Sequence, residues 1–257
     1  MATTSADYEE IPRSRSADLR RQYSSHHFVP ADQHIKPEDI DAVNRAGFIR
    51  KVYGILAAQM LLTCAVCFYC MWSEPIRMFV IHLFSFGYVG QLALFIPLMA
   101  VLCCLGAAKN EYPMNFFLLF IFTLFMAVDI GAVCAVYAQA GRGGVILEAF
   151  GLTAFLFLTL SAYTIISGKD FGFMGAYLFA GLLTCLAAGL LSMFIPGISG
   201  NIAYCVFGVL VFCGYIVYDT WKITKVFGYD DYITAAIELY LDILNLFLYL
   251  VQLLGDR

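Results

Sequence analysis

The stretch YITAAIELYLDILNLFLYLVQLL, residues 232–254, is mostly apolar and carries only two carboxylates. A transmembrane α-helix needs about 20 mainly apolar residues to cross the hydrocarbon core of a bilayer. A strand of a membrane β-barrel would instead alternate polar and apolar residues over about 10 positions, and this stretch does not alternate. The stretch therefore predicts a membrane-spanning helix.

Six earlier stretches have the same character, near residues 52–72, 86–108, 114–138, 145–167, 173–195 and 202–221. The whole chain is 61% hydrophobic and 13% charged, whereas soluble domains average about 45–50% and about 25%. The predicted fold class is an all-α integral membrane protein, a seven-helix bundle in the lipid bilayer.

Two domains are expected, a polar and disordered cytosolic tail over residues 1–49 and the transmembrane domain over residues 50–257. Two features stay open. Residues 78–85 are either interfacial or an extension of the second span, and the last segment either crosses fully or re-enters.

The orientation follows from the excess of lysine and arginine on the cytosolic side of short loops. If the N-terminal tail marks side one, eight basic residues near the helix ends lie on that side and three on the other. The eight are Lys36, Arg45, Arg50, Lys51, Lys109, Lys169, Lys222 and Lys225, and the three are Arg77, Arg142 and Arg257. This bias predicts a cytosolic N-terminus.

Five carboxylates lie inside the apolar stretches: Asp129, Glu148, Asp219, Glu238 and Asp242. An ionised group near the bilayer centre costs at least about 2.5 kcal/mol, so such residues usually face a bundle interior or water. Asp219 is near the cytosolic end of the sixth span, and Asp242 is about ten residues into the seventh. Side-by-side packing of these helices would bring the two together, where they share a proton or hold a cation; the alternative is two separately solvated acids.

Further oxygen ligands surround this predicted pair in the sequence. Glu238 is one helical turn before Asp242 and Asn245 is three residues after it, so the three form an oxygen-rich stripe. Calcium takes six to eight oxygen ligands, and this stripe with Asp219 supplies part of that shell. A solvated vestibule position is the alternative for Glu238.

Asp129 and Glu148 belong to the opposite, non-cytosolic half of the predicted bundle. Together they predict an acidic mouth that attracts cations. Glu148 is also consistent with a side chain that reaches the membrane interface, whereas Asp129 is deeper.

All nine cysteines lie in apolar stretches. Cys64, Cys67 and Cys70 have helical i, i+3 spacing, but no histidine or acid stands near them, so packing is favoured over a metal site. No disulfide framework is predicted.

Several motifs resemble those of the Bax-inhibitor and lifeguard (TMBIM) membrane proteins, and most closely the Golgi anti-apoptotic branch. They are RKVYGILAAQMLLT at 50–63, YPMNFFLLFIFT at 112–123, GKDFGFMGAYLFAGL at 168–182, FCGYIVYDT at 212–220 and DDYITAAIELYLDILNLFLYL at 230–250. The last two are the most specific, because they hold Asp219, Asp242 and Asn245.

The resemblance implies a seven-helix fold with a central last helix and a pH-sensitive calcium leak channel of Golgi or endoplasmic reticulum membranes. It also implies restraint of cell death, with calcium and protons as ligands, cell-death regulatory proteins as partners and no organic cofactor. The family's di-aspartyl sensor maps onto Asp219 and Asp242, whose protonated pair would latch the pore closed. The chain departs from its relatives at Met126, where they tend to carry a glutamate, and here the acid follows at Asp129.

Other functions use similar residues. A calcium/proton antiporter would need the same acids, and the sequence does not separate it from a channel. An intramembrane aspartyl protease also needs two aspartates on neighbouring spans. Tyr218–Asp219 fits the first half of its motif, but Leu239, Tyr240 and Leu241 stand where a Gly-x-Gly sequence would precede Asp242. A non-enzymatic role is therefore expected, and the net charge of −4 gives no reason to expect nucleic-acid binding.

Overall fold

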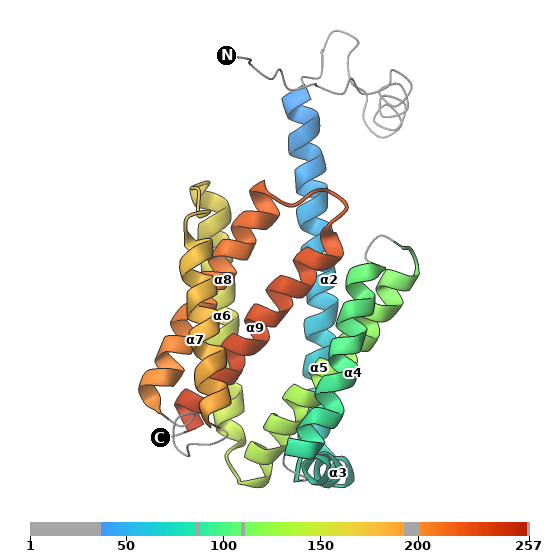
Figure 1. Cartoon of the computed structure of the whole chain (residues 1–257), viewed down its shortest axis with the longest axis vertical. Helices are drawn as coiled ribbons and strands as arrows, with labels where there is room; N and C mark the ends of the chain where they lie inside the picture. Colours follow the sequence, from blue (N-terminus) through green and yellow to red (C-terminus); the bar gives the residue numbers. More distant parts are fainter. Residues whose placement is uncertain (1–36, 86–87, 109–110, 193–200, 256–257) are drawn as a thin grey trace. The chain divides into compact units, whose positions relative to one another are not determined.

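The computed structural model describes residues 37–85, 88–108, 111–192 and 201–255, and the regular elements in these ranges are α-helices (Figure 1). Their bounds are α2 Pro37–Trp72, α3 Glu74–Ser85, α4 Tyr88–Ala107, α5 Met114–Gln139, α6 Gly143–Ser167, α7 Met174–Ser192, α8 Ile202–Lys225 and α9 Tyr232–Gly255. Residues 44–257 belong to one compact unit. The described part of the chain is thus all-α, as predicted.

The first helix begins earlier than the sequence analysis placed it. Residues 37–49 were assigned to a disordered tail, but α2 starts at Pro37 and continues without interruption to Trp72. Proline suits the first position of a helix, because the amide hydrogen that it lacks has no partner there. Phe48 is already buried, so the helix packs before the long apolar run begins. Residues 1–36 of the predicted tail lie outside the described residues.

Six helical segments are long and apolar enough to cross a membrane: Val43–Trp72, Met114–Gln139, Gly143–Ser167, Met174–Ser192, Ile202–Lys225 and Tyr232–Gly255. They match six of the seven predicted spans. The remaining predicted span, near 86–108, corresponds to α4, of which Phe95–Ala107 is an apolar segment shorter than the candidate spans. The count of seven crossings stays a prediction.

Local sequence signals fix several helix ends. Gly168 ends α6 in the left-handed conformation with φ 60°, which glycine adopts without steric cost. Asn201 caps α8, where its side-chain oxygen accepts a hydrogen bond from the Ala203 amide at 2.9 Å. Both residues lie between two of the predicted spans.

Residues 78–85 belong to α3, a helix distinct from α4. Val80 is buried in a small cluster with Cys70 of α2 and Ala135 of α5. The segment is therefore packed on the bundle as a short helix of its own.

Helix α8 ends at Lys225, one turn beyond the predicted limit at 221. Lys222 therefore lies on the same helix as Asp219, although the predicted span ended before it. Basic residues are favourable in the last turn of a helix, because they face the negative end of its dipole. The extension places a cation one turn from the predicted acid pair.

Helix α9 is the most enclosed of the candidate spans. In its apolar window 56% of the residues are buried, against 11% in α7. It packs against α5, α6 and α8, and Figure 1 shows it running obliquely past α8 and α6. Its high burial is what a central helix would require, although the central position itself stays a prediction.

Candidate functional site

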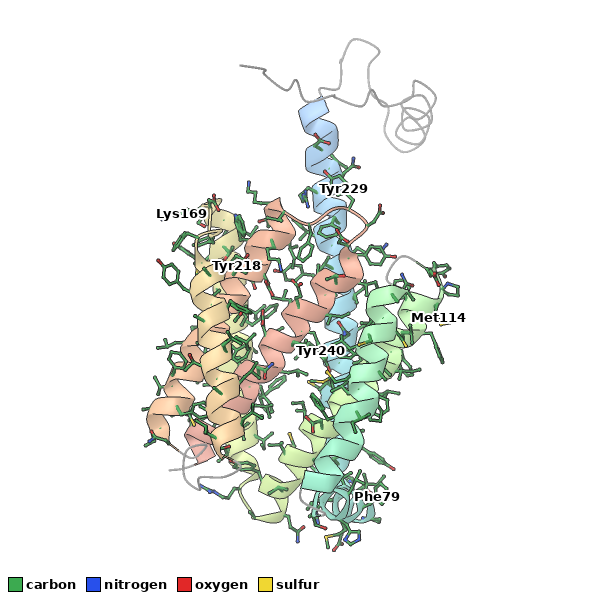
Figure 2. The ribbon with its side chains drawn as sticks, viewed as in Figure 1. Phe79, Met114, Lys169, Tyr218, Tyr229 and Tyr240 are labelled. Carbon is green, nitrogen blue, oxygen red and sulfur yellow. The ribbon has the colours of Figure 1, made fainter. Side chains whose placement is uncertain are left out.

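Asp219 of α8 and Asp242 of α9 lie together inside the bundle. Their exposed fractions are 5% and 6%, so both are taken out of solvent. Their carboxyl groups are close enough to interact with one another. An ionised carboxylate only accepts hydrogen bonds, so a hydrogen bond between the two requires a proton on one of them. Figure 2 labels Tyr218 and Tyr240, which mark the neighbourhood of the pair on α8 and α9.

The packing of two consecutive helices creates this contact. Residues 226–231 form a short link, and a short link favours antiparallel neighbours. Asp219 shares the buried face of α8 with Ile216 and Ile223, and Asp242 shares the buried face of α9 with Leu239 and Ile243. Both aspartates thus occupy core positions, where the pattern of apolar neighbours turns them inward.

Lys222 joins the acids of the two helices. Its ammonium group lies 3.4 Å from Oδ1 of Asp219 and 2.5 Å from Oε2 of Glu238. It also lies over the ring of Phe227, 4.7 Å from the centroid. The site is therefore a cluster of three acids and one base that spans α8 and α9.

Two further polar groups surround the cluster on α8. Tyr215 lies one turn before Asp219 and interacts electrostatically with both aspartates. Thr220, fully buried, shares a hydrogen bond of 3.3 Å with Ser161 of α6. These contacts bring α6 to the rim of the site.

One oxygen atom of the pair stays unsatisfied. Oδ2 of Asp242 is buried and has no hydrogen-bond partner among the described residues. A buried acceptor without a partner costs roughly 1–3 kcal/mol. The pair therefore holds an oxygen that a proton, a water molecule or a cation would satisfy.

The predicted oxygen stripe on α9 does not gather around this pair. Glu238 bonds to Lys222, and the Asn245 amide donates to the Leu241 carbonyl of its own helix at 2.8 Å. Among the described residues, no group of three or more His, Cys, Asp or Glu is arranged to hold a metal ion. A cation at this site would therefore meet the carboxyl groups of Asp219 and Asp242.

The other two predicted acids lie on helices other than the two that carry the pair. Asp129 is half-buried on α5 and Glu148 is exposed on α6. No metal-binding cluster within the described ranges includes them. Their proposed role as an acidic mouth stays a prediction.

From the sequence, Lys222 contributes only to the predicted orientation, and its place in the site is not predicted. The signal was available, because Asp219 and Lys222 are three residues apart and such pairs share a helix face. It was overlooked because the predicted span ended at residue 221.

A buried polar chain across three helices was also missed. Gln59 of α2 donates to Thr123 of α5 at 3.1 Å, and the hydroxyl groups of Thr63 and Tyr240 are 2.7 Å apart. Thr63 also donates to the Gln59 carbonyl, so the proton in the Thr63–Tyr240 bond comes from Tyr240. Nothing in the sequence pairs residues so far apart.

Comparison with known proteins agrees with the motifs described above. The profile of the family described as "Inhibitor of apoptosis-promoting Bax1" matches residues 45–257. Protein LIFEGUARD 4 of Arabidopsis thaliana is 41% identical over 215 residues, which cover 81% of this chain and 84% of the relative. The Golgi anti-apoptotic protein of Vaccinia virus (strain Lister) is 38% identical over 216 residues, which cover 82% of this chain and 85% of the relative. The predicted resemblance is confirmed, and the chain belongs to the Bax-inhibitor family of membrane proteins.

Proposed function

We propose that this protein is a pH-sensitive calcium leak channel of intracellular membranes, gated by Asp219 and Asp242. The observation that carries the proposal is the contact between these two buried carboxyl groups of neighbouring spans. The name of the viral relative supports a Golgi location and an anti-apoptotic role for this chain.

The gate works through one shared proton. Asp219 accepts a charge-assisted hydrogen bond from Lys222, so the proton of the pair resides on Asp242, which donates to Asp219. The bond ties α8 to α9 and closes the path. When pH rises and Asp242 loses its proton, two facing carboxylates repel by about 4 kcal/mol at about 4 Å, for an effective dielectric constant of about 20. The helices then separate, and the exposed carboxylates attract calcium.

The test is calcium efflux from liposomes that contain the purified chain, measured with equal pH on both sides from about pH 5 to about pH 8. For the unmodified protein, efflux rises with pH. Asp242→Asn cannot ionise and still donates a hydrogen bond to Asp219, so its efflux stays low throughout the range. The matched control is Asp230→Asn, an exposed acid in the α8–α9 link, which keeps the rising profile. If calcium efflux through Asp242→Asn still rises with pH, Asp242 is not part of the gate.

A double-mutant cycle tests whether the pair acts as one unit. Either Asp219→Asn or Asp242→Asn removes the shared proton site, so the second change has little left to remove. Coupled residues depart from additivity by about 0.5–3 kcal/mol. Single effects on the opening free energy that sum to the double mutant's value within about 0.5 kcal/mol would contradict the shared latch.

The same liposomes separate a channel from a calcium/proton antiporter. A leak carries calcium down its gradient without moving protons in a fixed ratio. An antiporter would change the internal pH in step with calcium and would drive calcium uphill when only a proton gradient is imposed. Movement of calcium against its gradient would contradict the proposed channel and would identify the protein as an exchanger.

A further inference from the structure

A large apolar groove runs between α2 and α6, and the charged side chains of the α8–α9 cluster are not part of its lining. Its volume is about 780 Å³, within the range of about 300–1,000 Å³ that is common for small-molecule sites. Ile243, Leu244 and Phe247 of α9 form its floor, together with Ile130 and Cys134 of α5. The groove is open on one side, where its lining includes exposed apolar side chains.

The groove follows the length of α2. Its lining on this helix begins at Tyr53 and ends at Met71, which at 1.5 Å per residue is about 27 Å. The hydrocarbon core of a bilayer is about 30 Å thick. Tyr53 contacts Phe157 of α6 with 6.3 Å between ring centroids, so the two aromatic rings mark one end of the groove.

Small residues make room along both walls. Ala57 lines the α2 side, and Gly143 and Ala154 line the α6 side. Leu61 of α2 and Leu147 of α6 are largely exposed at the rim. Both walls belong to candidate membrane spans, so the groove opens toward hydrocarbon, and an apolar chain is the occupant that its lining favours.

One polar atom in the groove needs a partner. The Tyr53 hydroxyl is buried and has no hydrogen-bond partner among the described residues. A phenol can donate a hydrogen bond to a carbonyl oxygen, and leaving it unpaired in the interior costs roughly 1–3 kcal/mol. A ligand for this groove therefore carries an acceptor near the Tyr53 end and an apolar chain beyond it.

A cation stands beyond that end on the same helix. Arg50 is exposed and is three residues before Tyr53, and residues with this spacing share a helix face. The order along the face is thus a cation, a hydrogen-bond donor and a long apolar surface. A glycerophospholipid presents the matching order of phosphate, ester carbonyl and acyl chain, and arginine suits phosphate recognition.

We propose that the groove between α2 and α6 binds one glycerophospholipid. An acyl chain fills the groove, its ester carbonyl accepts a hydrogen bond from Tyr53, and the phosphate pairs with Arg50. Neither the lipid site nor its test depends on ion conduction. An experiment that contradicts lipid binding therefore leaves the proposed channel activity untouched, and the reverse is also true.

The test uses photolabelling in vesicles of phosphatidylcholine. A small fraction of the lipid carries a diazirine on its acyl chain, and mass spectrometry maps the labelled residues of the full chain. Ile243 and Phe247 are buried, so a label on them requires a chain inside the groove. Label on Phe179 of α7, which is exposed, reports ordinary contact with the surrounding lipid.

The expected result is label on Ile243 and Phe247 as well as on Phe179. Ala57→Phe fills the groove, so the floor label is lost while the α7 label remains. Ala58→Phe is the matched control, since Ala58 is an exposed neighbour on α2 that is not part of the lining, and it keeps the floor label. Tyr53→Phe removes one hydrogen bond and lowers the floor label by about 2- to 10-fold.

Ala154→Phe blocks the groove from the opposite wall and replaces Ala57→Phe if that variant does not fold. Floor label that persists when a folded variant fills the groove overturns the proposal, as does wild-type label confined to exposed faces. A diazirine-bearing sterol that labels the floor more strongly than the phospholipid overturns the choice of occupant.

Discussion

Lys222 contacts carboxylates from two helices, Asp219 of its own helix and Glu238 of α9. Replacing it by methionine keeps much of the apolar stem but leaves Glu238 without its cation. Because both side chains are only partly buried, we expect a loss of about 1–2 kcal/mol in the free energy of unfolding, between the values for exposed and buried pairs. The calcium efflux transition should move to higher pH, because the aspartates must now ionise without a neighbouring cation.

Two variants separate the Lys222 charge from general damage. Lys222→Arg retains the cation and should keep the transition near its original pH. Lys225→Met removes an exposed lysine from the same last turn and should change neither thermal unfolding nor efflux. An unchanged efflux profile in Lys222→Met would show that the cation does not act on the acid pair.

At the scale of the elements, α9 is tied to α2 through Tyr240, which is fully buried and bonds to Thr63. Tyr240→Phe retains the aromatic ring but loses the hydroxyl group that donates to Thr63. Thr63 cannot supply the proton of this bond, because its own hydroxyl donates to the Gln59 carbonyl. We expect a loss of about 0.5–1.5 kcal/mol in the free energy of unfolding in detergent micelles. Polar contacts between membrane helices average about 0.6 kcal/mol, so the lower part of this range is favoured.

The comparison for this element is Tyr177→Phe on α7, where the tyrosine is 77% exposed. This variant loses a hydroxyl group that faces the surroundings, so unfolding should stay at the wild-type value. Equal stability of Tyr240→Phe and Tyr177→Phe would mean that the bond to Thr63 does not contribute to holding α9 in place.

At the scale of the whole molecule, one end of the bundle gathers basic and aromatic side chains. Arg45 of α2 donates to the Phe227 carbonyl in the α8–α9 link at 2.7 Å and lies over the Tyr229 ring. Lys51 lies 3.1 Å from the centroid of the Tyr232 ring. Figure 2 shows Tyr218, Tyr229 and Lys169 toward the same end, and Phe79 of α3 at the other. Because basic residues are in excess on the cytosolic side of membrane proteins, we expect this end to face the cytosol.

Protease protection in sealed organelles tests this orientation and the number of crossings together. A tag at Ala2 should be digested by protease added outside. A tag after Arg257 should be protected, because seven crossings place the two termini on opposite sides. Protection of the tag at Ala2 would show that the orientation is the reverse of the predicted one. Digestion of both tags would show that the chain crosses the membrane an even number of times.

Much of this protein follows from the sequence alone. Except for α2, which begins at Pro37 and not near residue 52, the apolar runs predicted the positions of the long helices to within a few residues, because each span must satisfy its backbone hydrogen bonds internally in lipid. The depth of Asp219 and Asp242 in those runs indicated that the two would meet if their helices packed side by side, and the specific motifs were enough to predict the family. The helix positions and the family both depend on the order of residues along the chain, which the sequence gives directly.

The contacts that depend on how helices rotate against one another were decided only by the tertiary structure. Lys222 reaches Glu238 because α8 continues past residue 221 and turns that side chain toward α9. Asn245 bonds to its own helix instead of joining the pair. The groove beside Tyr53 exists because α2 and α6 flank α9 without filling the space between them. A hydrophobic pattern gives the axial position of a side chain, but its partner on another helix depends on close packing of all the surrounding side chains.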